Sequence, residues 1–286
     1  MPSHARRAGV ALLLAACLFS SACSRFDLAY RHLDTLIPWQ VGRYVDLDKQ
    51  QRAALDEDLE QLLGWHCSTQ MPTYAAWLNE LEQQVRRETF DAGDVDRMLS
   101  RLDQAVDAIA VEATLPSASL LASLTDKQVG QIKKRFADQR KEDHKTYLAP
   151  SLDAQIDERT ERAVERAEGW FGRLNEEQRT RIQLWSAALR EQNEHWFESR
   201  EQWQAAFLEA LHQRAENGFT ERIGHLFQKR EQYWSSTYQD RYPTARSDLA
   251  SMIADLYALA TPAQRERLTR RIAQTRQQVE SVACSA

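Results

Sequence analysis

The stretch Leu124-Thr125-Asp126-Lys127-Gln128 places a helix-capping residue, Thr125, three positions before a glutamine. In such a capping box the cap side chain accepts a hydrogen bond from the third amide of the helix, and the glutamine side chain reaches back to the amide of the cap. The same pattern recurs at Leu47–Gln51, Leu174–Gln178 and Ala260–Gln264. The copies are unevenly spaced, so they predict four helix starts and not a solenoid of fixed period.

Helical spacing of apolar residues extends through the segments between these starts. The longest helix is expected to run from Asn175 to Asn217-Gly218, the charged segment 152–171 to form a peripheral helix, and Tyr242-Pro243 to break the chain. Another helix, ending near Pro116, is expected to face the core through Val95, Met98, Leu102, Val106 and Ile109. No segment shows sustained alternation with β-branched residues, so the sequence predicts an all-α fold, a multi-helix bundle of long amphipathic helices.

The N-terminus differs from the rest of the chain. Arg6 and Arg7 precede an apolar run from Val10 to Phe19, and small residues then lead to Cys23. The run is shorter than the ~20 residues that cross a bilayer, so residues 1–22 are predicted to be a cleaved secretory signal peptide. A cysteine directly after such a site is the residue that bacterial lipoprotein processing modifies with diacylglycerol and palmitate. Cys23 is the predicted lipid-bearing residue; the alternatives are Cys17, or an ordinary signal peptide without lipid.

Ser24 follows the predicted lipid-bearing cysteine. In Gram-negative bacteria an aspartate at this position retains a lipoprotein in the inner membrane, so serine predicts the outer membrane. The mature chain then divides into a lipidated N-terminal segment with short helices, residues 23–46, and a helical-bundle domain, residues 47–286, facing the periplasm. The membrane is an expected partner through the N-terminal lipid.

The charge of the chain bears on its other partners. The formal net charge is −5, and removal of Arg6 and Arg7 with the signal peptide lowers it to −7. An acidic body without a block of Lys and Arg argues against nucleic acid as a partner, because phosphate binding needs clustered cations.

Two of the four cysteines, Cys67 and Cys284, remain in the mature body. The periplasm is oxidising, so they are candidates for a disulfide that would close nearly the whole domain. Two unpaired thiols are the alternative, since sequence does not show whether the two Cα atoms come within about 7 Å.

The sequence contains no set of residues that identifies a catalysed reaction. A glycine-rich phosphate loop, a Gly-x-Ser-x-Gly elbow and a His-Glu-x-x-His zinc motif are all missing. Glu209 and His212 form a single Glu-x-x-His pair, whereas a di-metal bundle needs two such pairs and two further carboxylates. We therefore expect no catalytic residue, no metal and no cofactor.

The candidate binding surface is an aromatic group near the end of the first capped helix. It comprises Trp65, His66, Tyr74 and Trp77. The alternative interpretation is an aromatic packing corner beside Pro72.

Several stretches resemble a Gram-negative lipoprotein family catalogued as domain of unknown function 6279. They are Cys23-Ser24-Arg25, Leu36-Ile37-Pro38-Trp39, Tyr44-Val45-Asp46-Leu47 and Trp65-His66. The resemblance favours Cys23 over Cys17, because the lipid-bearing cysteine of the family precedes Ser-Arg. It implies location and fold but no activity. Cys67 stands where the family is expected to carry a charged residue, so the resemblance does not imply the disulfide.

A weaker likeness, carried by Leu124–Gln128, is to periplasmic stress adaptor and chaperone proteins with repeated Leu-Thr-x-x-Gln motifs. Together these features predict a noncatalytic outer-membrane lipoprotein that binds an envelope protein or an unfolded client. The alternative, which rests on location alone, is a hydrolase of a cell-envelope polymer.

Overall fold

The computed structural model describes residues 30, 32–87, 89–282 and 284, and no strand occurs among them. The all-α prediction is confirmed for this part of the chain. The predicted signal peptide and both candidate lipid-bearing residues, Cys17 and Cys23, lie outside the described residues.

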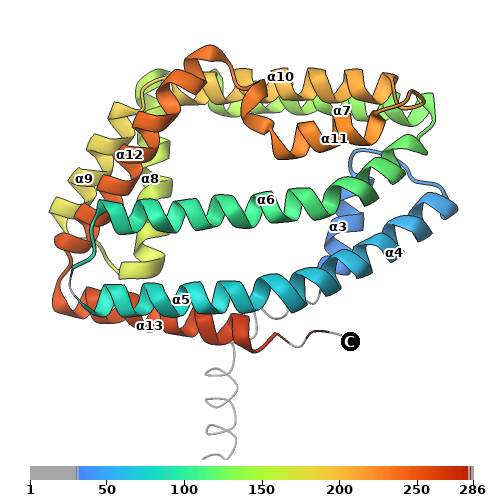
Figure 1. Cartoon of the computed structure of the whole chain (residues 1–286). Helices are drawn as coiled ribbons and strands as arrows, with labels where there is room; N and C mark the ends of the chain where they lie inside the picture. Colours follow the sequence, from blue (N-terminus) through green and yellow to red (C-terminus); the bar gives the residue numbers. More distant parts are fainter. Residues whose placement is uncertain (1–29, 31, 88, 283, 285–286) are drawn as a thin grey trace, which may run out of the picture.

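The helices follow one another with short connections (Figure 1). In chain order they are α3 (Leu33–Gly42), α4 (Lys49–Trp65), η1 (His66–Gln70), α5 (Met71–Arg86), α6 (Ala92–Ala122), α7 (Asp126–Asp143), η2 (His144–Leu148), α8 (Leu152–Phe171), α9 (Glu176–Ala188), α10 (Gln192–His212), α11 (Phe219–Gln228), η3 (Arg230–Tyr233), α12 (Ser236–Ala258) and α13 (Pro262–Glu280).

Two separate groups of buried side chains hold the helices together. The first joins α5, α8, α9, α12 and α13, with Ile182 and Ile272 among its most buried members. The second joins α7, α10, α11 and the ends of α3 and α6, around Leu211 and Ile223. The continuous α4–η1–α5 rod and the long helix α6 run between the two groups (Figure 1).

All four predicted capping boxes are present, at Asp48, Thr125, Asn175 and Thr261. Each also has a role that the sequence pattern alone did not reveal, because the capping glutamines meet in pairs. Pairing joins helix starts that lie far apart in the sequence.

In the first pair, the side-chain amides of Gln51 and Gln128 donate to each other's oxygens, at 3.2 and 2.6 Å. The amide of Gln51 also donates to the carbonyl of Ser123, and that of Gln128 to the carbonyl of Asp46. Each of these carbonyls lies two residues before the other helix's cap, so the two helix starts are joined symmetrically.

The second pair, Gln178 and Gln264, joins two helix starts in the other group of helices through one amide–amide bond. Gln264 donates to the side-chain oxygen of Gln178 at 3.0 Å and to the carbonyl of Arg173 at 2.9 Å. Gln178, which is fully buried, donates to the carbonyl of Leu256. Buried amides cost free energy unless they are hydrogen-bonded. A shift of either helix start would break these bonds, so the pairs fix the positions of the helix starts.

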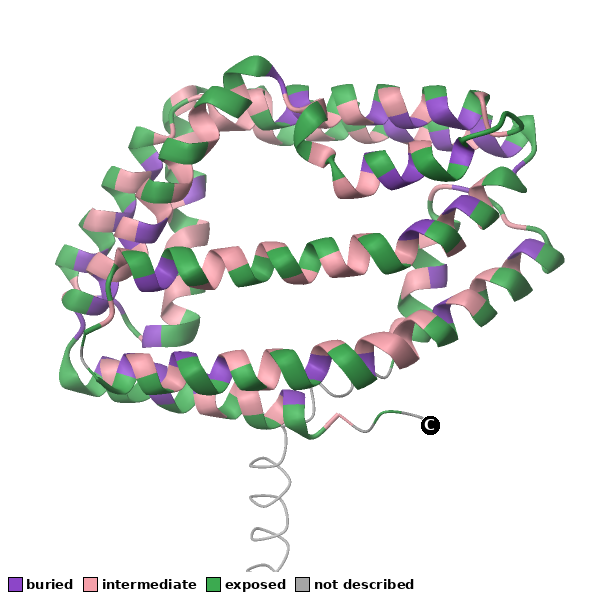
Figure 2. Cartoon of the chain, in the orientation of Figure 1, coloured by how far each residue is buried: buried purple, intermediate pink, exposed green. Residues whose placement is uncertain are grey.

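Helix α6 contradicts the sequence interpretation in two respects. It continues through Pro116 to Ala122, and none of its residues between Val95 and Thr114 is buried (Figure 2). Leu102 and Val106, expected to face the core, are 43% and 49% exposed. The apolar residues of α6 have the spacing of a core helix. The two groups of packed side chains that α6 joins, however, lie at the two ends of the helix.

One side of α6 does pack, against α11 and α12. The helices approach closely at Gly224, where a Cβ atom would come within 3.3 Å of the Thr114 methyl, and Gln228 donates to the Thr114 hydroxyl. Among the described helices, α6 has the length and apolar composition of a membrane span. The ion pairs of Asp96 and Asp103 with Arg246 place it within the helical body instead.

The predicted long helix from Asn175 is wrong, because it is two helices, α9 and α10, separated at Arg190, whose φ is +47°. The guanidinium of Arg159 explains the break: it is buried and donates to the carbonyls of Ser186 and Arg190, the free carbonyls at the end of α9. The segment 152–171 is therefore only partly peripheral.

The predicted break at Tyr242-Pro243 is also wrong. Pro243 lies inside α12, in its third turn. A proline removes one backbone hydrogen bond from a helix interior, and here the surrounding packing keeps the helix continuous.

Replacement of Gln178 by methionine, which has a similar volume, should lower the free energy of unfolding by about 2–4 kcal/mol. The change removes the capping bond, removes one of the two acceptors of the Gln264 amide, and takes the Gln178 donor away from the Leu256 carbonyl. Urea unfolding followed by circular dichroism measures the loss. The control is Gln183→Met, at an exposed position of the same helix; equal stability of the two variants would contradict a structural role for the pair.

Candidate functional site

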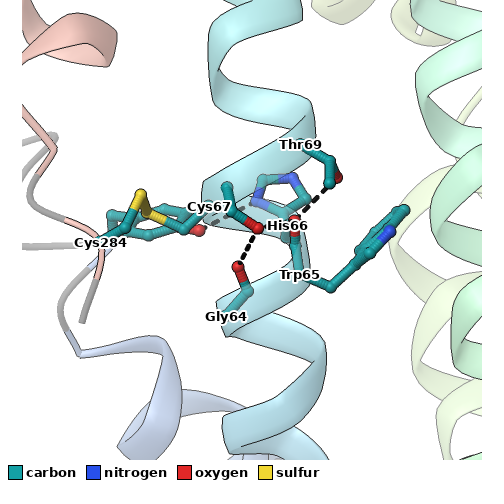
Figure 3. The surroundings of a disulfide bond; sticks show 8 residues. Gly64, Trp65, His66, Cys67, Thr69 and Cys284 are labelled. Carbon is teal, nitrogen blue, oxygen red and sulfur yellow. Dashed lines mark hydrogen bonds between the residues drawn. A yellow bond between two sulfur atoms is a disulfide. The ribbon is translucent and has the colours of Figure 1, made fainter. Parts of the chain in front are cut away.

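The junction of α4 and α5, where the candidate binding surface was predicted, is a π-helical turn. It spans His66–Gln70 and lets the two helices form one continuous rod. The side chains of Ser68 and Thr69 donate to the carbonyls of Gly64 and Trp65, at 2.9 and 2.7 Å (Figure 3). Single π-turns inside α-helices often accompany functional sites, because the extra residue re-aims the side chains around it.

His66 is held between two tyrosines. The hydroxyl of Tyr30 lies 3.0 Å from its Nδ1, and the hydroxyl of Tyr74 lies 3.3 Å from its Nε2. The Tyr30 ring stacks on the imidazole, whereas the Tyr74 ring meets it edge-on. A neutral imidazole has one donor and one acceptor nitrogen, so both hydroxyls are satisfied without a proton being added.

Burial shifts the pKa of each member of this cluster toward its neutral form. It lowers the pKa of His66, and it raises the pKa of Tyr74. Burial also raises the pKa of Tyr30, and the nearby Tyr74 adds to that shift. The cluster is therefore an uncharged hydrogen-bonded unit at neutral pH, and it fastens the N-terminal segment to the α4–α5 rod.

The four predicted residues do not make one surface. The structure brings together His66 and Tyr74, while Trp65 points to the opposite side of the rod from the disulfide (Figure 3). Trp77 is half-buried and belongs to neither group of packed side chains. Tyr30 could not be predicted as a partner of His66, since a contact across 36 residues leaves no local signal in the sequence.

Cys67 and Cys284 form a disulfide, with their Cα atoms 5.5 Å apart. Cys67 is buried in the π-helical turn, directly after His66, and Cys284 follows the end of α13 (Figure 3). The packing of α13 along α5 brings the two cysteines together. Of the two alternatives left open by the sequence, the structure has the bonded one.

A groove of about 1000 Å³ lies between α6, η3 and α12. Its charged lining is two arginines and the carboxylates of Asp103, Asp107 and Glu231. Arg246 bonds to Asp103 at 2.7 Å, and Arg230 pairs with Asp107 at 3.3 Å. Trp234 and Tyr242, whose ring centroids are 4.6 Å apart, supply an aromatic wall. Because each arginine is already paired, the groove suits a neutral polar or apolar ligand better than an anion.

The Glu209–His212 pair singled out in the sequence does not line a common hollow. Glu209, Glu221 and His225 line a hollow of about 310 Å³ between α10 and α11, whereas His212 does not. The Glu209 carboxylate accepts a bond from Gln213 at 2.6 Å. In the part of the chain that the structure describes, no three His, Cys, Asp or Glu side chains come together in a way that could hold a metal ion.

Removal of the disulfide should lower stability by up to about 5 kcal/mol, the chain-entropy value for a loop of this size. Cys284→Ser should melt earlier than the wild type in oxidising buffer. Reductant should lower the melting temperature of the wild type to that of the variant and leave the variant unchanged. A wild type that is insensitive to reductant would argue against the bond.

The His66 cluster should make stability depend on pH. Since the folded-state pKa of His66 is lowered, its contribution is complete above the unfolded value of about 6.5. As the pH falls below that value, the unfolded chain takes up the proton first, and stability decreases. Urea unfolding between pH 7.5 and 5.5 should show a shallower decrease for His66→Gln, whereas the exposed control His212→Gln should keep the wild-type slope.

Comparison with known proteins supports the family resemblance only. Searches of curated proteins and of solved structures found no match, and nothing supports the likeness to the periplasmic stress adaptor and chaperone proteins. The model of a family of unknown function, DUF6279, matches residues 43–239, which include the π-helical turn, α6 and the start of α12. The match covers more than half of the chain, and the protein therefore belongs to the DUF6279 family.

Proposed function

We propose that this protein is a noncatalytic lipoprotein of the Gram-negative outer membrane whose helical body binds a polypeptide segment of an envelope protein. The N-terminal features support the location: a short signal-like segment, Cys23 as the residue to be acylated, and Ser24 after it. The binding role is supported by the body, and by α6 above all.

The observation that carries the proposal is the exposure of apolar side chains along α6. Leu102, Val106, Val111 and Leu115 are between 43% and 67% exposed, and none of them belongs to either group of packed side chains. At about 100° per residue, Leu102 and Val106 lie on one side of the helix and Val111 and Leu115 on nearly the opposite side, so α6 carries two exposed apolar pairs. Exposed apolar surface on a folded body is a feature of interaction sites. Stability does not account for it, because both ends of α6 are already secured.

The groove beside α6 adds the polar groups that a polypeptide backbone requires. The groove is lined by Ser100, Gln232 and Tyr242, next to Asp103 and Asp107. A partner segment that lays apolar side chains on α6 can therefore direct backbone groups toward hydrogen-bonding side chains. Recognition sites commonly combine apolar contact with a few placed polar groups.

The alternative, hydrolysis of an envelope polymer, has weaker support. A hollow of about 470 Å³ between α8 and α9 is lined by Glu161, Glu165, Glu168 and Glu176. The Glu168 carboxylate is engaged by Arg179, and in the groove beside α6 Asp103 and Asp107 are paired with arginines. Paired glycosidase carboxylates, by contrast, need one proton-donating acid beside a free carboxylate.

Site-specific photocrosslinking in cells tests the proposal. A crosslinking residue at Leu115 should capture an envelope protein, and the same residue at Leu184 should not, because Leu184 is equally exposed but lies on α9. The change Val111→Asp, introduced with the crosslinker at Leu115, which lies one turn away on the same side of α6, should strongly reduce the yield. Identical products from Leu115 and Leu184, or no product from either, would contradict a binding role of α6.

A further inference from the structure

A second exposed apolar surface lies on α3. This helix follows the predicted lipid-bearing Cys23 closely in the sequence. Trp39 is 61% exposed and Leu36 is 46% exposed. They lie three residues apart, on one side of the helix, and Arg43 follows on the same side. The Arg43 guanidinium stands 5.4 Å from the centre of the Trp39 ring. We call these three residues the α3 stripe.

The chemistry of the α3 stripe matches the boundary of a lipid bilayer. Tryptophan is enriched where headgroups meet acyl chains, and arginine keeps its charge among the headgroups while its stem lies along apolar surface. The single carboxylate of α3, Asp34, lies about 160–200° around the helix from Leu36, so it does not face the same way. The stripe is therefore apolar and cationic, without an anion.

The α3 stripe cannot turn independently of the body. Pro38, on the opposite side of α3, is buried, and Val41 and Tyr44 pack against the second group of helices. Before the helix, Tyr30 is fastened to His66. The direction in which Leu36 and Trp39 point is thus set by the fold.

Chain length brings the α3 stripe within reach of the membrane. The first residue of α3, Leu33, comes ten positions after Cys23, and an extended chain of that length spans at most ~35 Å. Cys23 to Tyr30 is shorter still, at most ~25 Å. An acylated Cys23 therefore keeps the start of α3, and the His66 junction to which Tyr30 is bonded, within a few tens of ångströms of the bilayer.

From these observations we infer that the α3 stripe seats the body on the membrane, with Leu36 and Trp39 at the acyl–headgroup boundary and Arg43 among lipid phosphates. The inference rests on the proposed acylation of Cys23. Lipid chains supply the affinity, and the stripe supplies the orientation: it fixes which side of the helical body faces away from the membrane. Helices that lie in the interface use the same combination of Trp, Leu and basic residues.

Tryptophan fluorescence in vesicles with brominated acyl chains tests the seating. The acylated full-length protein is reconstituted in vesicles of phosphatidylethanolamine and phosphatidylglycerol, with or without bromine on the chains. Bromine should quench part of the emission. Trp39→Phe should abolish the bromine-dependent part, because it removes the reporter, whereas Trp196→Phe, at another exposed tryptophan, should retain it.

A second variant separates the reporter from the contact. Leu36→Asp keeps Trp39 but places a charge in the α3 stripe, so it should also lose the bromine-dependent quenching while circular dichroism stays unchanged. Equal emission from wild type in both kinds of vesicle would overturn the seating, as would a Trp39 signal that depends on protein concentration and not on lipid, which would identify a second copy as the occupant.

Flotation and mass spectrometry of the same samples distinguish the two possible failures. Protein that floats with the vesicles and carries acyl chains on Cys23, but shows no quenching, overturns the seating alone. Protein with an unmodified Cys23 overturns the proposed anchor, and the seating with it.

Discussion

The structure depends on hydrogen bonds between side-chain amides at helix starts. Gln51 with Gln128, and Gln178 with Gln264, each close a capping box and at the same time hold two helix N-termini together. An amide in this position has no freedom, because its oxygen accepts from the cap and its nitrogen donates to a distant carbonyl. Each pair lies at one group of helices, so the two groups are organised by the same device.

This arrangement explains how α6 can expose apolar residues without unfolding. Its ends are secured by the two groups of helices, and Asp96, Asp103 and Asp107 tie one of its sides to arginines. The middle of the helix therefore contributes little to stability and is available for contact. Proteins commonly keep such surface at a cost in solubility where it serves recognition.

Local rules were sufficient for much of the fold. All four capping boxes and the all-α class could be predicted, since both depend on residues a few positions apart. Partners across the fold could not: the glutamine pairs, Tyr30 on His66, and Arg159 at the end of α9 join residues between 27 and 86 positions apart. The periodicity of α6 misled for a related reason, because spacing shows that a face is apolar but not whether anything covers it. Of the four residues of the candidate surface, His66 and Tyr74 are in contact, and the binding role predicted for them stays a prediction.

The disulfide between Cys67 and Cys284 gives the chain the topology of a loop closed over 217 positions. A protease that cuts once anywhere inside that loop, for example at the connections before α7 or α9, produces two pieces that stay covalently joined. Both pieces also remain attached to the N-terminal segment, which leaves the loop at Cys67. In an oxidising compartment rich in proteases, a nicked molecule is thereby retained as one unit, and its helices can stay in place around the cut.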